Sequence, residues 1–175
     1  HLIINEGLQK NSPMIQLSSY SILIPSKSIC KIEYKIGTSI NLSSGFLIKF
    51  FKGENDFFCL MTNEHVITKE LINQKNTIFL SYNYESKVKE IQLNQEERYI
   101  KDFTEIEINA IIVEILPEDN IETDYFLLPY EENLYEFNEL INEEITIIQY
   151  PKGHLSYSNG KIKEINKYEF KHLAI

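Results

Sequence analysis

Short runs of apolar and aromatic residues alternate along the chain with clusters of Gly, Asn, Asp and Lys. Residues 87–93 alternate between polar and apolar side chains, which is typical of a strand with one solvated face. Residues 110–113 are apolar throughout and indicate a strand that is buried on both faces. Runs of this length, rich in Ile, Phe, Tyr and Val, favour β-structure. The pattern predicts strands at Ile29–Ile36, Gly45–Phe51, Phe57–Met61, Thr77–Leu80, Lys87–Leu93, Ala110–Leu116, Tyr125–Leu128, Ile145–Tyr150 and Gly160–Ile165.

Helical periodicity is rare in this sequence. It predicts one short helix at Glu64–Asn73, and residues Glu131–Asn142 fit either an amphipathic surface helix or an acidic loop. Many short strands with few helices predict an all-β fold, either an antiparallel sandwich or a barrel. An acidic stretch at Pro117–Asn142 indicates a boundary between two subdomains.

Composition and charge narrow the function classes. The 175 residues are 43% apolar, which is enough to bury a core. The net charge of −9 argues against a nucleic-acid partner, because such proteins usually carry clustered Lys and Arg. No apolar run approaches the roughly 20 residues that span a bilayer, so we expect no membrane partner.

Cysteine and histidine spacing gives no sign of a metal site or a cofactor. The chain has only two cysteines, Cys30 and Cys59, and a secreted chain of this size often has more. We therefore expect reduced thiols and an intracellular, cytoplasmic protein, although the spacing alone does not decide whether the two form a bridge. No Cys-x-x-Cys, His-Glu-x-x-His or Gly-rich phosphate motif occurs, so no metal and no cofactor is predicted.

His65 is the histidine with the most informative setting. It follows the apolar strand predicted at Phe57–Met61, in the sequence Thr-Asn-Glu-His-Val-Ile at residues 62–67. A histidine at the exit of a core strand has a fixed backbone and an accessible ring, which a general base requires. His1 and His154 have no such setting and are interpreted as structural or solvated.

A series of motifs, in order, resembles the trypsin-like serine peptidases of the chymotrypsin fold. The resemblance spans about residues 28–173 and comprises the histidine motif just described and the segments Ser28–Ile32, Ser44–Ile48, Asn109–Ile115, Gln149–Gly153 and Tyr157–Ile162. It implies a chymotrypsin-like double antiparallel β-barrel. The first barrel would occupy residues 28–116, after an N-terminal extension at 1–27, and a linker with a partial second barrel would occupy 117–175.

The chemistry of that family needs a Ser nucleophile, a His general base and a carboxylate that holds the correct His tautomer. The resemblance places His65 as the base and puts Asn109 where the family carries Asp. An amide has no negative charge, and replacing the triad carboxylate by an amide lowers turnover about 10⁴-fold. Asp102, Glu105 or Glu107 are alternative carboxylates if the alignment shifts.

The nucleophile is the second departure from the family. No Gly-x-Ser-Gly loop occurs up to Ile175, and Ser156 and Ser158 lack the flanking glycines of an oxyanion hole. Residues Tyr168–Ala174 resemble the strand that leads into the nucleophile loop. We therefore expect the second barrel to be incomplete, and a nucleophile to come from sequence beyond residue 175.

From this resemblance we expect a trypsin-like serine endopeptidase domain or a fragment of one. We expect the 175-residue chain itself to have no peptidase turnover. The alternative is a pseudopeptidase that acts as a protein- or peptide-binding module. The expected partner is a polypeptide substrate or a protein, including a complementary C-terminal segment. A third interpretation, an unrelated all-β interaction domain, would be favoured by a structure in which His65 does not face Asn109.

Overall fold

The computed structural model describes residues 26–52, 55–82, 88–129, 140–166 and 170–174. Most of the expected 1–27 extension and most of the segment 131–142, for which a helix or loop was expected, lie outside these ranges. Ten strands, one short α-helix and several 3₁₀ turns are present in the described part. The prediction of an all-β fold is confirmed.

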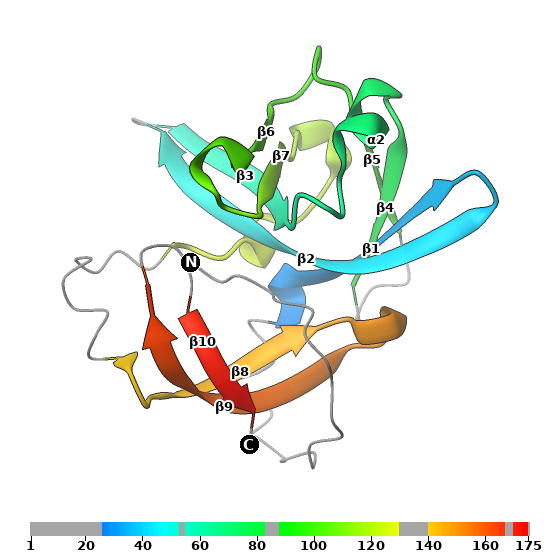
Figure 1. Ribbon diagram of the computed structural model, residues 1–175. Coiled ribbons are helices and arrows are strands. Elements are labelled where there is room, and N and C mark those ends of the chain that lie inside the picture. The colour runs from blue at the N-terminus through cyan, green and yellow to red at the C-terminus, as the bar shows by residue number, and fades with distance from the viewer. Residues whose placement is uncertain (1–25, 53–54, 83–87, 130–139, 167–169, 175) are drawn as a thin grey trace.

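Seven antiparallel strands form a sheet that curves into a half-barrel (Figure 1). Their order across the sheet is β5-β4-β1-β2-β3-β7-β6. The strands are β1 (Ile29–Ile36), β2 (Ser39–Lys52), β3 (Asn55–Thr62), β4 (Thr77–Ser81), β5 (Lys89–Gln92), β6 (Ile100–Asp102) and β7 (Ile111–Glu114). The helix α2 (Lys69–Asn73) lies between β3 and β4 in the chain.

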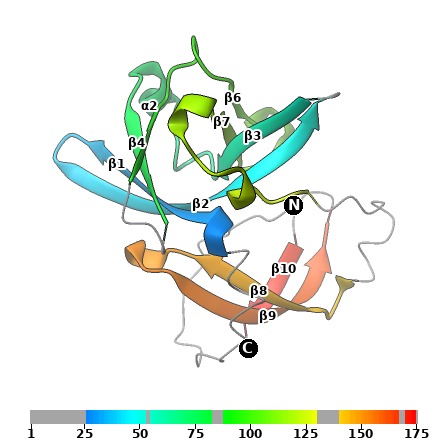
Figure 2. The ribbon, with the colours of Figure 1, turned by 180° about the vertical axis from the view of Figure 1, so that it is seen from behind.

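A smaller sheet of three antiparallel strands follows in the chain and lies on one side of the half-barrel (Figures 1 and 2). It contains β8 (Glu144–Gln149), β9 (Ser156–Ile165) and β10 (Phe170–Ala174), in the order β10-β9-β8. The 3₁₀ turns η2 (Pro117–Asp119) and η3 (Thr123–Tyr125) precede it, and η5 (Pro151–Gly153) joins β8 to β9. The proposed division at residue 116 falls between β7 and η2, and it stays a prediction.

The interior of the half-barrel is filled by aliphatic side chains that alternate along the strands. Fully buried members include Ile32, Leu47, Leu60, Ile78 and Val113. A second, smaller apolar cluster of Ile29, Phe46 and Tyr150 joins β1 and β2 to the end of β8. The alternation of buried and exposed positions is the reason that the sequence pattern identified most strands.

Several elements differ from the sequence prediction. The expected strand Tyr125–Leu128 is reduced to one parallel bridge between Leu127 and Ile48, because Pro129 has no N–H to continue the ladder. The expected helix Glu64–Asn73 starts only at Lys69, where the hydroxyl of Thr68 accepts a hydrogen bond from the backbone N–H of Leu71. The short strand β6 was not predicted.

Candidate functional site

The end of β3 positions His65. Thr62, the last residue of β3, pairs with Ile111 at the start of β7, and its hydroxyl donates to the carbonyl of Ser44 (2.8 Å). The chain then turns, with the backbone N–H of Val66 donating to the carbonyl of Asn63. The imidazole of His65 is exposed at this turn, directly after β3.

The same register brings Asn109 to His65. Asn109 lies two residues before Ile111, so continuing the β3–β7 pairing past Thr62 places it opposite Glu64. Its side-chain nitrogen Nδ2 lies 3.3 Å from Nδ1 of His65. Two residues that are 44 positions apart in the sequence therefore contact each other, and the structure meets the condition that His65 faces Asn109.

The amide of Asn109 has a defined orientation. The backbone N–H of Glu64 donates to its oxygen Oδ1, with an N···O distance of 3.0 Å. A backbone N–H can only donate, so the oxygen must face Glu64 and the NH₂ group must face His65. The side chain of Asn109 is exposed, whereas the carboxylate of a catalytic triad is buried.

This orientation fixes the tautomer of the neutral imidazole. Since the NH₂ group of Asn109 can only donate, Nδ1 of His65 must accept, and the ring proton then resides on Nε2. A general base needs the opposite arrangement, with the proton on Nδ1 and a free lone pair on Nε2. The pair therefore presents an N–H donor to a ligand and offers it no proton acceptor.

The three alternative carboxylates are engaged elsewhere. Asp102 accepts hydrogen bonds from the backbone and hydroxyl of Thr104, and Glu105 pairs with Lys101 at 3.4 Å. Glu107 ends a 3₁₀ turn in the left-handed conformation (φ 62°), so it does not share a strand face with Asn109. Nothing in the described structure joins any of these three to His65.

The remaining candidates lie away from this pair in the fold. Ser156 and Ser158 pair with β8 as part of β9, and the hydroxyl of Ser156 donates to the carbonyl of His154 (3.2 Å). His154 is exposed at the end of η5. His1 lies outside the described residues.

Cys30 and Cys59 are free thiols in the structure. Cys30 pairs with Gly45 across β1 and β2, while Cys59 pairs with Ile48 across β2 and β3. Burial raises the pKa of each thiol to about 12, so neither is a nucleophile at neutral pH. The residues that the structure describes also contain no group of His, Cys, Asp and Glu that could hold a metal ion.

Comparison with protein-family models and with curated proteins finds no match for this chain. Among the described residues, no helix combines the length and the apolar character that a membrane crossing requires. The geometry of the site is therefore the main guide to function. The backbone N–H of Glu64, which sets the orientation of Asn109, has no signature in the sequence.

Proposed function

We propose that this protein is a trypsin-like serine-peptidase domain of the chymotrypsin type. In it, the contact between His65 and Asn109 persists in a non-catalytic form. The observation that supports it most is the contact between His65, at the exit of a core strand, and Asn109, at the position of the family's aspartate. A half-barrel followed by a smaller antiparallel sheet is compatible with a double barrel whose second half is incomplete.

Between the two functions that such a domain offers, the amide orientation favours polypeptide binding over hydrolysis. In the tautomer described above, Nε2 of His65 carries a proton, so it cannot accept one from a serine hydroxyl. An exposed N–H donor is well suited to a peptide carbonyl, which only accepts hydrogen bonds. The pseudopeptidase is thus the preferred function, and the endopeptidase is the second candidate.

Peptide binding and hydrolysis can be measured on the same samples. Fluorescein-labelled peptides from a casein digest are titrated with the 175-residue chain and followed by anisotropy, while mass spectrometry detects cleavage. We expect saturable binding without cleavage. His65→Ala should weaken binding by about threefold to tenfold, the effect of one hydrogen bond. His154→Ala is the matched control, because this exposed histidine directly follows η5, away from the contact between His65 and Asn109, and it should bind like the unmodified chain.

Two kinds of result would contradict the proposal, one from catalysis and one from binding. Cleavage that disappears in His65→Ala would establish the endopeptidase instead, as would a stoichiometric adduct with a fluorophosphonate probe. Absence of saturable binding, or equal loss in the His65 and His154 variants, would remove the support for a binding role at this histidine.

A further inference from the structure

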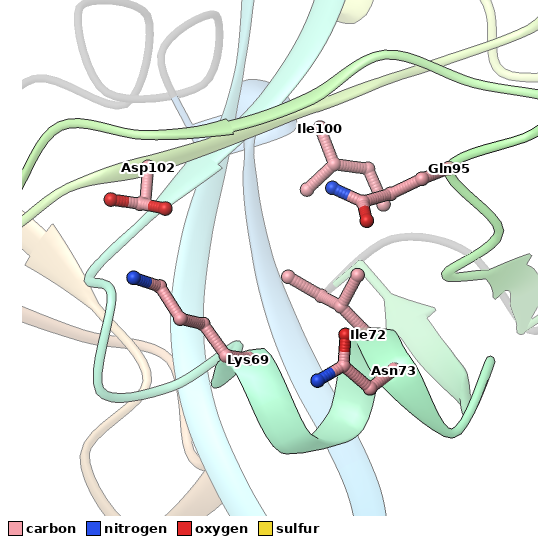
Figure 3. A pocket seen from close by; sticks show the side chains of 6 residues that line it. All are labelled: Lys69, Ile72, Asn73, Gln95, Ile100 and Asp102. Carbon is pink, nitrogen blue, oxygen red and sulfur yellow. The ribbon is translucent and has the colours of Figure 1, made fainter.

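A cavity of about 180 Å³ lies between α2 and β6. Figure 3 shows the side chains around it: Lys69, Ile72, Asn73, Gln95, Ile100 and Asp102. Neither His65 nor Asn109 lines the cavity, so an inference about it does not depend on the proposed peptidase-like function. The volume is below the roughly 300–1,000 Å³ of sites for drug-sized ligands, which limits the occupant to a small molecule.

One side of the cavity carries a charge of each sign. Figure 3 shows the ammonium group of Lys69, from the start of α2, and the carboxylate of Asp102, from the end of β6, pointing toward one another. Within the described residues they form no direct ion pair, so a gap separates the two charges. Opposite charges that face each other across a gap can both be paired by a ligand that carries both signs.

The carboxylate of Asp102 is held in place and stays ionised. Its oxygen Oδ1 accepts hydrogen bonds from the hydroxyl and the backbone N–H of Thr104. These hydrogen bonds, the one from the hydroxyl first, together with the charges of Lys69 and Lys101, lower the pKa of Asp102 below its usual range. Oδ2 makes no hydrogen bond within the described part of the chain and remains able to accept one from a ligand.

The other side of the cavity suits the body of a small polar molecule. The side chains of Ile72 and Ile100 are almost completely buried and provide an apolar floor. The amides of Asn73 and Gln95 lie beside them, and an amide can both donate and accept hydrogen bonds. With one cation and one anion, the cavity favours neither a polyanion nor a polycation.

We propose that this cavity binds a free α-amino acid with a polar side chain. Lys69 pairs with the ligand's carboxylate and Asp102 pairs with its ammonium group. The ligand's methylene groups pack on Ile72 and Ile100, and its polar end reaches the amides of Asn73 and Gln95. L-Glutamine has all of these groups.

The test is a titration of the ¹⁵N-labelled chain with L-glutamine at pH 7, followed by NMR. We expect saturable shifts of the backbone amides at Lys69–Asn73 and Ile100–Asp102. Asp102→Asn and Lys69→Met should each weaken binding at least about tenfold, in line with the loss of one charge-assisted hydrogen bond. Lys101→Met is the matched control, because this neighbour of Asp102 pairs with Glu105 and does not line the cavity.

The dispersion of each variant's spectrum shows whether it is folded, and the two variants remove opposite charges. The proposal is wrong if the shifts do not saturate, or if both folded variants bind L-glutamine as the unmodified chain does. D-Glucose provides a further check, since it fills a similar space without charge. Equal shifts with D-glucose that persist in Asp102→Asn would show a site for neutral polar molecules instead.

Discussion

The thiols of Cys30 and Cys59 illustrate how burial sets chemistry at the level of a single residue. Because each pKa is raised from 9.0 to about 12, the folded protein should not react with a thiol reagent at pH 8. We expect Ellman's reagent to modify both cysteines only at the rate of unfolding. The protein in 6 M guanidinium chloride is the control and should react at once, while rapid modification of the folded chain would contradict the burial.

The same shift predicts a pH dependence of stability. A thiol whose pKa is higher in the folded state stays protonated after the unfolded chain has begun to ionise, so alkali favours the unfolded chain. The free energy of unfolding should therefore be constant below pH 9, as far as these two groups are concerned, and fall between pH 9 and 12. Urea titrations of the Cys30→Ala and Cys59→Ala variants should show a smaller fall than the unmodified chain, and an equal fall would contradict this assignment.

The sequence predicted that His65 and Asn109 lie together and that an amide there weakens catalysis, but it did not predict how that amide is oriented. His65 and Asn109 were found from the order of the motifs, and the β3–β7 register brings them together. The orientation of the Asn109 amide depends on the backbone N–H of Glu64, which is a group that every residue except proline has. The cavity was not predicted either. Lys69 and Asp102 form no motif in the sequence, and only the fold brings them to the same cavity.

Element boundaries differed from the sequence pattern where tertiary contacts decide them. β1 was predicted over its full length because its core-facing residues alternate with polar ones. β2 extends six residues further toward the N-terminus than expected, from Ser39 rather than Gly45. That part contains Asn and Ser, which have low strand propensity, and pairing with β1 holds it in the sheet. β6 has only three residues, too few for a periodicity.

A buried ion pair holds the loop after β7 against the turn before β6. Arg98, the one arginine of the sequence, makes two hydrogen bonds to the carboxylate of Asp119, at 2.8 and 3.1 Å. Arg98 also donates to the carbonyl of Glu114, and Asp119 accepts from the backbone N–H of Leu116. Both side chains are only 5% exposed, so neither charge can be solvated if its partner is lost.

Arg98→Met should therefore lower the free energy of unfolding by about 3–5 kcal/mol, because it leaves the buried carboxylate of Asp119 without its cation. Urea denaturation at pH 7 measures the change. Lys75→Ala is the control: it removes the solvent-exposed pair with Glu96, and its unfolding midpoint should stay within error of the unmodified chain. Equal effects of the two substitutions would contradict the distinction between the two pairs.

At the scale of the whole molecule, Ser44 joins the half-barrel to the smaller sheet. It is buried in β2, and its hydroxyl accepts a hydrogen bond of 2.8 Å from the backbone N–H of Tyr150, just after β8. The apolar cluster of Ile29, Phe46 and Tyr150 surrounds this contact. The sequence gives no sign of this contact, since the partner of Ser44 is 106 residues away.

Ser44→Ala should remove the hydroxyl that accepts this hydrogen bond from the buried backbone N–H of Tyr150, and should lower the free energy of unfolding by about 1–3 kcal/mol. Hydrogen exchange should accelerate most in β8 and β9, because the smaller sheet loses one of its contacts with the half-barrel. Ser39→Ala, at the exposed start of the same strand, is the matched control. If exchange accelerates equally in both variants, Ser44 does not hold the two sheets together.

The most direct test of the account is the tautomer of His65, measured by long-range ¹H–¹⁵N NMR at a pH where the ring is neutral. In the unmodified chain we expect the proton on Nε2. In Asn109→Asp, a carboxylate can accept from both Glu64 and the imidazole, so the proton should move to Nδ1. A proton on Nδ1 in the unmodified chain, or the same tautomer in both proteins, would contradict the claim that the amide of Asn109 keeps this histidine from acting as a base.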